Sequence, residues 1–463
     1  WELSDIVGEL YLQLSGPSYQ EHGFLRMLEV GQTFTSEVCA LSFVHGGFQE
    51  AMQQLTRYRR IIRRPNKDNS NPSVIFNDYM NCLWGQPTTE KLLPLIDAAA
   101  RAGCHFFCID AGWYADDLWW DEVGEWLPST VRFPNGITEP IHYIREQGMI
   151  PGLWLELEVM GIRCPLAEKV DDSWFFVRNG RRVIDEGRYQ LDYRNPAVRD
   201  YADTVIRRLV EEYGVGYIKM DYNINAGLGT EIDSDSLGEG LLEHTRAYLK
   251  WIDTIFARYP DLVIENCSSG GMRMSYAPLA RQSIQSVTDQ TDYLKMSAIA
   301  ANCVTAVTPE QAAIWSYPLA DGDEEETIFN MVNAILLRVH QSGHLAELSL
   351  ERLALVTEGI AYHHTISKDL SEGLPFWPLG MASFTSPWRA FGIKTNKARY
   401  LAVWRTLGGE DHIDLKIDGA QNQNLTASCT YPQSRPPEFS WNHQSGILRV
   451  SLAEKTARVF KID

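Results

Sequence analysis

The feature that most constrains the fold is an alternation of strand-like and helix-like segments, which begins at residue 73 and continues over roughly 290 residues. Parallel strands need helical crossovers between them, and eight such strands can close on themselves. The sequence therefore predicts an α/β fold, a (β/α)8 TIM barrel. Its eight strand-like segments are short and rich in apolar residues: "SVIFNDYM", "CHFFCIDAGW", "MIPGLWLELEV", "YQLDY", "VGYIKMDYN", "DLVIENCSSGG", "QSIQSVTDQTD" and "AAIWSYP".

Two further regions flank the predicted barrel, because 463 residues are too many for one small core. Residues 1–70 contain short apolar segments and a basic helical stretch, "FQEAMQQLTRYRRIIRRP", and end at the polar break "NKDNSNPS". Residues 369–463 contain short alternating strands such as "ARYLAVWRT" and "GILRVSLAE", separated by turn residues. We therefore expect an N-terminal segment, a barrel over residues 71–368 and a C-terminal antiparallel β-sandwich domain.

The composition argues against several classes of partner. A formal net charge of −18 disfavours nucleic acids and anionic membranes, which need basic patches. No apolar stretch approaches the roughly 18 residues of a membrane span. The eight cysteines include no CxxC pair, which disfavours zinc ribbons and disulfide scaffolds. We expect a reducing, cytoplasmic location, no metal and no cofactor. The chain starts at Trp1, which suggests a cut rather than a native terminus.

Polar side chains gather where the predicted strands end. In a (β/α)8 barrel the carboxyl ends of the strands form the active site, so a series of such residues points to a functional site rather than to solubility. The series consists of Asp110, Glu156, Glu158, Asp192, Lys219, Asp221, Glu265, Cys267 and Asp289.

Two chemistries use such a ring of carboxylates. Three or more acids can hold a divalent cation, or a pair of acids can hydrolyse a glycoside. The second is favoured because tryptophans, whose faces suit sugar rings, are abundant near the strand ends. They are Trp113, Trp119, Trp120, Trp126 and Trp154. A metal-dependent lyase or hydrolase and a degenerate sugar-binding module without activity remain the alternatives.

The order of the motifs resembles one enzyme family. "DAGW", "FPNGI", "GLWLELEV", "GRYQLDYRNPAVRDY", "YIKMDYN", "ENCSSGG" and "TDQTD" occur in the order found in the melibiase-type α-galactosidases of glycoside hydrolase family 36. The resemblance covers most of residues 70–463. It implies a retaining α-glycoside hydrolase that acts on a small carbohydrate, with a homo-oligomer left open. The segment before residue 70 resembles only the tail of the family's N-terminal β-supersandwich.

The resemblance assigns the two catalytic carboxylates. It implies that Asp221 of "KMDYN" is the nucleophile and that Asp289 of "TDQTD" is the acid/base. Two carboxyl groups about 5 to 5.5 Å apart would give a covalent glycosyl-enzyme and net retention. Lys219 would keep Asp221 ionised, and the negative charge of Asp221 would raise the proton affinity of Asp289.

The resemblance also implies a set of residues around the sugar. Asp110 and Lys219 would bind hydroxyls, and Trp154 would form an apolar wall or else pack in the barrel. Glu156 and Glu158 would order the site from behind or contact the sugar. Asp292 would contact the ligand or form an Asx-turn. The remaining members of the set are Arg188 as a hydrogen-bond donor, Asn223 beside the nucleophile, and Cys267 and Ser269 near the C2 substituent.

Two positions depart from the family pattern. Asp110 is followed by Ala111, where the family usually has a second aspartate associated with the C4 and C6 hydroxyls. Ser269 replaces a usual glycine near C2. We therefore expect an α-galactosidase acting on terminal α-galactosides, with an α-N-acetylgalactosaminidase or another α-hexosidase as the alternative.

Overall fold

A computed structural model describes residues 2–4, 8–13 and 16–463. Its centre is a closed barrel of eight parallel strands, so the predicted (β/α)8 barrel is confirmed. The strands, in chain order, are β3 (Ile75–Asn77), β4 (Phe106–Ile109), β5 (Ile150–Leu155), β11 (Tyr217–Met220), β12 (Val263–Asn266), β13 (Ile284–Ser286), β14 (Ala312–Ser316) and β15 (Arg338–Gln341).

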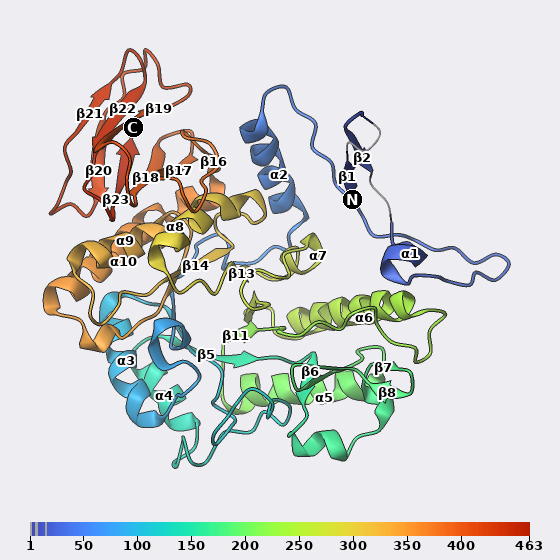
Figure 1. Cartoon of the computed structure of the whole chain (residues 1–463). Coiled ribbons are helices and arrows are strands. Elements are labelled where there is room, and N and C mark those ends of the chain that lie inside the picture. The colour runs from blue at the N-terminus through green and yellow to red at the C-terminus, as the bar shows by residue number, and fades with distance from the viewer. Residues whose placement is uncertain (1, 5–7, 14–15) are drawn as a thin grey trace.

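Each barrel strand is followed by a helix before the next barrel strand begins, as parallel pairing requires. The helices surround the barrel (Figure 1). In chain order they are α3 (Thr89–Ala102), α4 (Thr138–Glu146), α5 (Pro196–Arg207), α6 (Leu237–Arg258), α7 (Tyr276–Leu279), α8 (Tyr293–Asn302), α9 (Glu324–Ile335) and α10 (Leu350–Glu372).

One of the eight predicted strands was wrong. The segment "YQLDY" forms β10 (Arg188–Gln190), which pairs antiparallel with β6 (Val159–Gly161) and β9 (Ile184–Asp185) in a small sheet outside the barrel. A second excursion, β7 (Val177–Arg178) with β8 (Arg181–Arg182), lies in the same long connection. The eighth barrel strand is β15 instead, which periodicity missed because its sequence, "RVHQ", is mostly polar.

The polar side chains of β15 are buried and contact residues of other elements. Arg338 is fully buried, and its guanidinium forms hydrogen bonds of 2.6 and 2.9 Å with the carboxylate of Asp68 and donates to the carbonyl of Ser73. The ring of His340 stacks on Trp315 of β14 with the centroids 3.9 Å apart. Hydrogen bonds therefore compensate the burial of Arg338, whereas His340 is held by ring stacking and its two ring nitrogens have no hydrogen-bond partner in the described structure.

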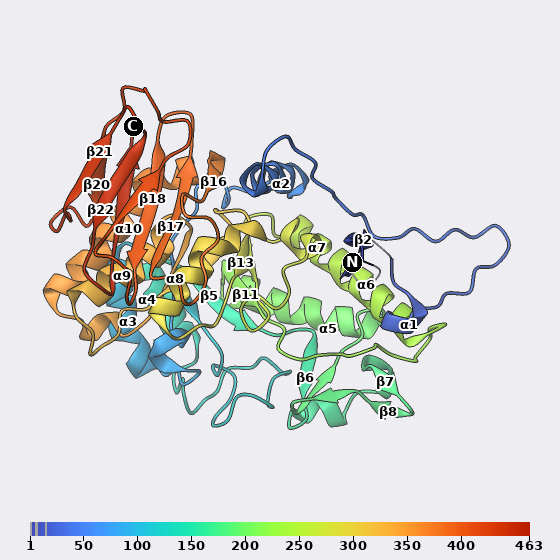
Figure 2. The ribbon, with the colours of Figure 1, turned by 45° about the horizontal axis from the view of Figure 1, so that its top comes forward.

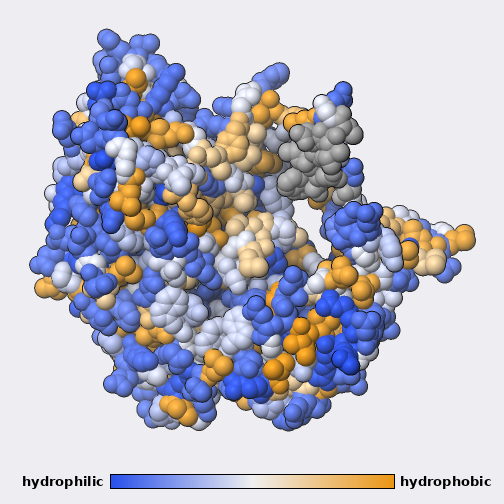
Figure 3. Space-filling view, viewed as in Figure 1, coloured by the Kyte–Doolittle hydropathy of each residue, from blue (hydrophilic) through white to orange (hydrophobic). Residues whose placement is uncertain are grey.

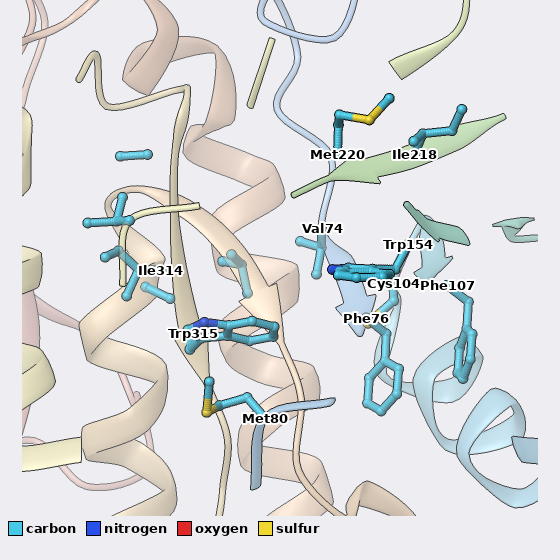
Figure 4. Close-up of a cluster of buried hydrophobic side chains, with 14 of the residues drawn as sticks. Val74, Phe76, Met80, Cys104, Phe107, Trp154, Ile218, Met220, Ile314 and Trp315 are labelled. Atoms are coloured by element: carbon cyan, nitrogen blue, oxygen red, sulfur yellow. The ribbon is translucent and has the colours of Figure 1, made fainter. Parts of the chain in front are cut away.

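The strand β11 shows how the barrel places charged groups. It pairs with β5 on one side and β12 on the other. Its residues alternate between the two faces, so Tyr217 and Lys219 share one face and Ile218 and Met220 share the other. Tyr217 packs with Phe106 and other residues of the barrel strands. Figure 4 shows Ile218 and Met220 within the main hydrophobic cluster. Lys219 therefore follows Tyr217 into the barrel.

The C-terminal region is a β-sandwich, as predicted. One sheet has the order β16 (Leu374–Phe376), β17 (Trp388–Lys394), β18 (Arg399–Arg405), β23 (Thr456–Ile462) and β20 (Ala427–Tyr431). The other has the order β19 (His412–Lys416), β22 (Ile447–Ser451) and β21 (Phe439–Asn442). Leu401, Leu415, Val450 and Phe460 share their common core. The domain boundaries at residues 70 and 368 stay predictions, and α10 runs through the second.

The N-terminal region extends along the outside of the barrel (Figures 1 and 2). It contains the antiparallel pair β1 (Glu2–Ser4) and β2 (Tyr11–Gln13), the short helix α1 (Tyr19–His22) and the basic helix α2 (Phe48–Ile62). α2 docks through Arg60 and Arg63, which bind Glu310. The segment between α1 and α2 exposes Val30 and Phe43, and hydrophobic side chains colour its tip in Figure 3.

Among the helices in the described part of the chain, none has both the length and the apolar character to cross a membrane. All eight cysteines lie within the described residues, and none is paired.

The Arg338–Asp68 pair generates a prediction about stability. Asp68→Ala should lower the free energy of unfolding by about 3–5 kcal/mol, because it leaves the guanidinium of Arg338 buried without its carboxylate. Urea denaturation measures the change. The neighbouring Lys67→Ala is the matched control: Lys67 pairs with Asp261 in an exposed ion pair, so its loss should cost less than about 1 kcal/mol. Equal effects of the two variants would contradict the prediction.

Candidate active site

The carboxyl ends of the barrel strands bring four charged side chains of the predicted site into electrostatic contact. Lys219 lies on β11 and Asp221 follows it, Asp110 follows β4, and Asp289 comes shortly after β13. Lys219 interacts electrostatically with all three carboxylates. Asp110, Lys219 and Asp221 are nearly buried, at 2%, 3% and 6% exposed, whereas Asp289 is exposed. The site is therefore a buried charge cluster with one accessible acid.

Asp221 is held by hydrogen-bond donors on both carboxylate oxygens. The indole N–H of Trp154 donates to Oδ2 at 3.1 Å, and the backbone N–H groups of Tyr222 and Ser269 donate to Oδ1 at 2.8 and 3.2 Å. Burial alone would raise the pKa of Asp221, but the charge of Lys219 and hydrogen bonds from Asn223, Tyr222 and Cys267 outweigh burial, so its pKa lies below the ordinary value. The arrangement keeps Asp221 ionised and fixed in direction.

Lys219 forms a close ion pair with Asp110. Its Nζ donates to Oδ2 of Asp110 at 2.9 Å, and Asn77 donates to the same oxygen at 2.6 Å. Burial opposes the charged ammonium, but Asp110 and the other carboxylates prevail and hold the pKa of Lys219 well above its usual value. The Oδ1 atom of Asp110 accepts the backbone N–H of Ala111 at 2.8 Å, so both oxygens of Asp110 have donors within the protein.

Asp289 differs from Asp221 in its affinity for a proton. The surrounding protein desolvates the carboxyl group even though solvent reaches the residue, and this raises its pKa to about 6. The negative charges of Asp221 and Asp110 act in the same direction, and the charge of Lys219 opposes them. One carboxylate is therefore stabilised as an anion and the other as an acid, which is the division of labour that a glycosidase uses.

Asn223, Ser269 and Cys267 lie around the nucleophile candidate. Oδ1 of Asn223 accepts hydrogen bonds from the backbone N–H and the hydroxyl of Ser269 at 2.8 and 2.7 Å. Ser269 adopts a positive φ of 43°, a conformation that favours glycine. Cys267 is fully buried, and burial and the charge of Asp221 raise its thiol pKa well above the usual value. Cys267 is therefore inert as a nucleophile. Its thiol helps to lower the pKa of Asp221 through a hydrogen bond, and its predicted place near the C2 substituent stays a prediction.

Arg188 lies behind the site rather than at its surface. It is fully buried, forms an ion pair with Glu156 and stacks over Trp120 with its guanidinium carbon 3.7 Å from the ring centroid. Glu156 in turn accepts the backbone N–H of Asn223 at 2.5 Å. Glu156 and Arg188 therefore order the loop after β11. The predicted role of Arg188 as a sugar donor would have to use Nη2, the one guanidinium nitrogen without a partner in the described structure.

Trp154 was expected to form an apolar wall, with barrel packing as the alternative, and its packing matches the alternative. The residue is 1% exposed and lies against Tyr114, Trp119 and Trp126. Its contact with the site is the indole N–H donated to Asp221. A tryptophan in this position fixes the carboxylate, and the predicted role of its face as a wall for a sugar ring stays a prediction.

Asp292 and Asp192 have local hydrogen-bonding roles. Asp292 is the N-cap of α8, and its Oδ1 accepts the backbone N–H groups of Leu294 and Lys295, as the turn alternative expected. Asp192 does not end a barrel strand, so its place in the predicted ring was wrong. It pairs with Arg194 at 2.6 Å, in a loop after β10. The preceding residues, "YQL", were predicted as a barrel strand because of their apolar character.

Glu158 forms a second buried network behind the site. Its carboxylate pairs with Arg273 at 2.7 Å and lies 3.5 Å from His244. Arg273 belongs to the loop after β12, which also carries Ser269. Glu158 therefore ties that loop to the end of β5, which agrees with the predicted ordering role.

Sequence reasoning missed Asp78, which directly follows β3. Its Oδ1 accepts the backbone N–H of Asp110 at 2.7 Å, while Oδ2 is buried without a partner in the described structure. Burial and the neighbouring Asp110 raise its pKa well above the usual value. The signal was present in "SVIFNDYM", where an aspartate ends a predicted strand as in the other motifs. Trp315 and His340, stacked beside Lys219, gave no such signal.

A metal centre was the competing reading of the acidic ring. Within the described residues no group of three or more His, Cys, Asp or Glu side chains is arranged to hold a metal ion. Asp110, Glu156 and Glu158 are paired with Lys219, Arg188 and Arg273 instead. Metal independence of any activity stays a prediction.

Comparison with known proteins gives one family match. The Melibiase family model matches residues 33–314, more than half of the chain. The chain is 25% identical over 288 residues to α-galactosidase Mel36A of Lactobacillus acidophilus, covering 60% of the chain and 38% of that protein. It is 29% identical over 282 residues to α-galactosidase AgaA of Geobacillus stearothermophilus, covering 58% of the chain and 37% of that protein. The chain thus spans less than two-fifths of the length of these relatives.

Solved structures agree on the fold. The GH36 α-galactosidase AgaA of Geobacillus stearothermophilus superimposes with a TM-score of 0.77 at 16% identity, covering 89% of this chain and 59% of that one. A doubly substituted variant of the same enzyme, solved in complex with stachyose, gives a TM-score of 0.77 at 17% identity and covers 90% of this chain and 59% of that one.

Glu265 of β12 provides a test of the buried electrostatics. It accepts a hydrogen bond from the hydroxyl of Tyr217, and its other oxygen lies 3.9 Å from His340. Burial raises its pKa from 4.5 to about 7, with the charge of Lys219 opposing. The folded chain therefore holds a proton that the unfolded chain has released, and stability is lost as the pH rises from about 4.5 to about 7.

Glu265→Gln should remove this loss, because glutamine is neutral at every pH. We expect the variant to be more stable than the parent by roughly 1–3 kcal/mol at pH 8, with the difference shrinking to less than about 1 kcal/mol at pH 5. Urea denaturation at the two pH values measures it. Glu410→Gln, on an exposed loop, should show no such dependence. A variant that is less stable at pH 8 than its parent would contradict the prediction.

Proposed function

Because the chain belongs to the melibiase family, we propose that it is a retaining α-glycoside hydrolase of the α-galactosidase type. The observation that carries the proposal is the contrast between two carboxyl groups near the same ammonium. Asp221 has a lowered pKa, and Asp289 has a pKa raised to about 6. A double-displacement mechanism requires that contrast, because one group must attack as an anion while the other donates a proton.

The proposed reaction has two steps. In the first, a carboxylate oxygen of Asp221 forms a bond to the anomeric carbon, while protonated Asp289 gives its proton to the departing glycosidic oxygen. In the second, Asp289 takes a proton from water, whose oxygen attacks the anomeric carbon and releases Asp221. The configuration is inverted twice, so the product retains it. The proposal requires the two carboxyl groups to lie about 5 to 5.5 Å apart.

Lys219 and Asp110 are proposed to bind hydroxyls of the glycone, since they sit beside both catalytic carboxyl groups. Because both oxygens of Asp110 already accept hydrogen bonds, a sugar hydroxyl would share these acceptors or receive a hydrogen bond from Lys219. Ser269 is proposed to lie near C2, since its N–H donates to Asp221. Substrates of the stachyose type, as bound by the AgaA variant, are the first candidates.

Ala111 bears on which sugar the enzyme accepts as its glycone. Ala111 is 1% exposed and packs in the main core, so its methyl group adds no acceptor at the position where the family usually has an aspartate. The alternatives are an α-N-acetylgalactosaminidase or another α-hexosidase of the same mechanism, and a sugar-binding protein without turnover. A panel of nitrophenyl α-galactoside, α-N-acetylgalactosaminide and α-glucoside separates them, and hydrolysis of none would favour the binding protein.

Asp221→Ala tests the nucleophile. On the best substrate of the panel we expect turnover to fall by several orders of magnitude with folding intact, because no carboxylate remains to form the covalent intermediate. Added azide should restore turnover and give a glycosyl azide of inverted configuration. A variant that keeps more than about a tenth of the parent rate, a loss of only about 1.4 kcal/mol, would assign the role to another residue.

The acid/base role of Asp289 predicts a pH profile. Its pKa of about 6 means that kcat/KM for an alkyl galactoside should fall as the pH rises above about 6, because the proton needed by the leaving oxygen is lost. Dinitrophenyl galactoside needs no such proton, so its first step should lack this limb. Asp289→Asn should slow the alkyl substrate by about 10²–10⁴-fold and the dinitrophenyl substrate far less. An unchanged basic limb in Asp289→Asn would contradict the assignment.

A further inference from the structure

A cavity lies outside the barrel, between the helix α2 and the C-terminal β-sandwich. Its volume is about 320 Å³. Gln49, Glu50 and Gln53 line it from α2, and the rest of the lining comes from β16 with the following residues, the β17–β18 hairpin and the residues at the end of β19. Figures 1 and 2 both show α2 beside β16, so two regions far apart in the sequence enclose this space.

Arg399, the first residue of β18, is a cation in this wall for which the described residues supply no counter-ion. It is 8% exposed, and its Nη2 donates to the carbonyl of Gly419 at 2.8 Å. Its Nε is buried without a hydrogen-bond partner, and no described carboxylate forms an ion pair with it. The buried arginines Arg188 and Arg338 each have a carboxylate. Arg389 and Arg405, like Arg399, donate to carbonyl groups instead, but they do not line this cavity. A buried guanidinium costs free energy unless it is paired, so Arg399 is incompletely compensated.

A second cation stands beside Arg399. Lys394 is directly opposite Arg399 in the β17–β18 register. Its Nζ lies 3.6 Å from the position that a Cβ at Gly419 would occupy, so both cations converge on Gly419. Burial and the charge of Arg399 lower the pKa of Lys394. Two like charges therefore share one end of the cavity, which an anion would relieve.

The charged groups that line the cavity include more cations than acids. Lys416 adds a third cation, and the acids are Glu50 and Asp418. Glu50 is engaged in capping α2, where it accepts the backbone N–H of Gly47 at 2.8 Å. Asp418 attracts Lys394 but forms no ion pair with Arg399. The lining thus carries three cations and two acids, although the chain as a whole has a net charge of −18.

We propose that this cavity is a binding site for a small oxyanion-bearing ligand, whose carboxylate or phosphate group sits against Arg399 and Lys394. A guanidinium with free N–H groups binds such planar or tetrahedral oxyanions through charge-assisted hydrogen bonds. Phe376, Trp377 and Pro378 provide an apolar wall. The volume lies at the lower end of the range for small-molecule sites, which suits a ligand of monosaccharide size. The site is separate from the catalytic one and does not depend on the proposed hydrolysis.

Titration calorimetry of the full chain at low ionic strength tests the site with three probes: inorganic phosphate, glucuronate and glucose. We expect phosphate or glucuronate to bind with a Kd below about 1 mM and glucose not to bind here. Tighter binding of glucuronate would identify an acidic sugar as the source of the oxyanion, and tighter binding of phosphate would identify a free or phosphorylated ligand. Either supports the site, and absence of binding by both anions overturns it.

Variants locate the binding. Arg399→Gln and Lys394→Gln should each weaken it by about 10-fold or more, since each removes a charge-assisted contact. Lys394 is exposed, so its variant should fold even if loss of the Arg399–Gly419 bond impairs the other. Lys397→Gln, an exposed lysine in the turn of the same hairpin, is the matched control and should bind as the parent does. Equal binding by Lys394→Gln and Lys397→Gln would overturn the proposal.

Discussion

The candidate site at the carboxyl end of the barrel depends on one buried ammonium, that of Lys219. It is 3% exposed and pairs with Asp110 at 2.9 Å. Its charge lowers the pKa of Asp221 and opposes the raised pKa values of Asp289 and Glu265. A cluster of acids this close together would take up protons if no cation stood among them. The strand β11 supplies that cation because alternation places Lys219 on the same inward face as Tyr217.

The two candidate catalytic acids differ in the hydrogen bonds that their carboxyl groups accept. Asp221 accepts hydrogen bonds from an indole N–H and two backbone N–H groups, so its anion is solvated by fixed dipoles. Asp289 is exposed, is partly desolvated and faces two negative neighbours. Burial acts on both groups, and only Asp221 has donors that outweigh it. The networks of Glu156 with Arg188 and of Glu158 with Arg273 hold the loops that provide these dipoles.

Much of the fold followed from periodicity, because seven of the barrel strands lie in the segments that were predicted as strands. β15 did not, since Arg338 and His340 are buried only through partners distant in the sequence, Asp68 and Trp315. β10 was mistaken for a barrel strand because an apolar local sequence indicates that a strand is buried but not which sheet it belongs to. For the candidate site, the positions of the acids could be predicted because they follow the ends of predicted strands. Their partners, such as the N–H of Trp154, depend on side-chain directions that only the closed barrel fixes.

The two departures from the family pattern have different physical consequences. The methyl group of Ala111 is buried and packs in the core, where it offers no hydrogen-bond acceptor. Ser269 is different, because its φ of 43° costs a non-glycine residue free energy. Hydrogen bonds offset that cost: its N–H donates to Asp221 and Asn223, and its hydroxyl donates to Asn223. The serine thus keeps the backbone donor that stabilises the Asp221 anion and adds a hydroxyl beside it. Under the proposed function, selectivity at the glycone is therefore more open to change at Ser269, which contacts the proposed nucleophile Asp221, than at Ala111, which the core encloses.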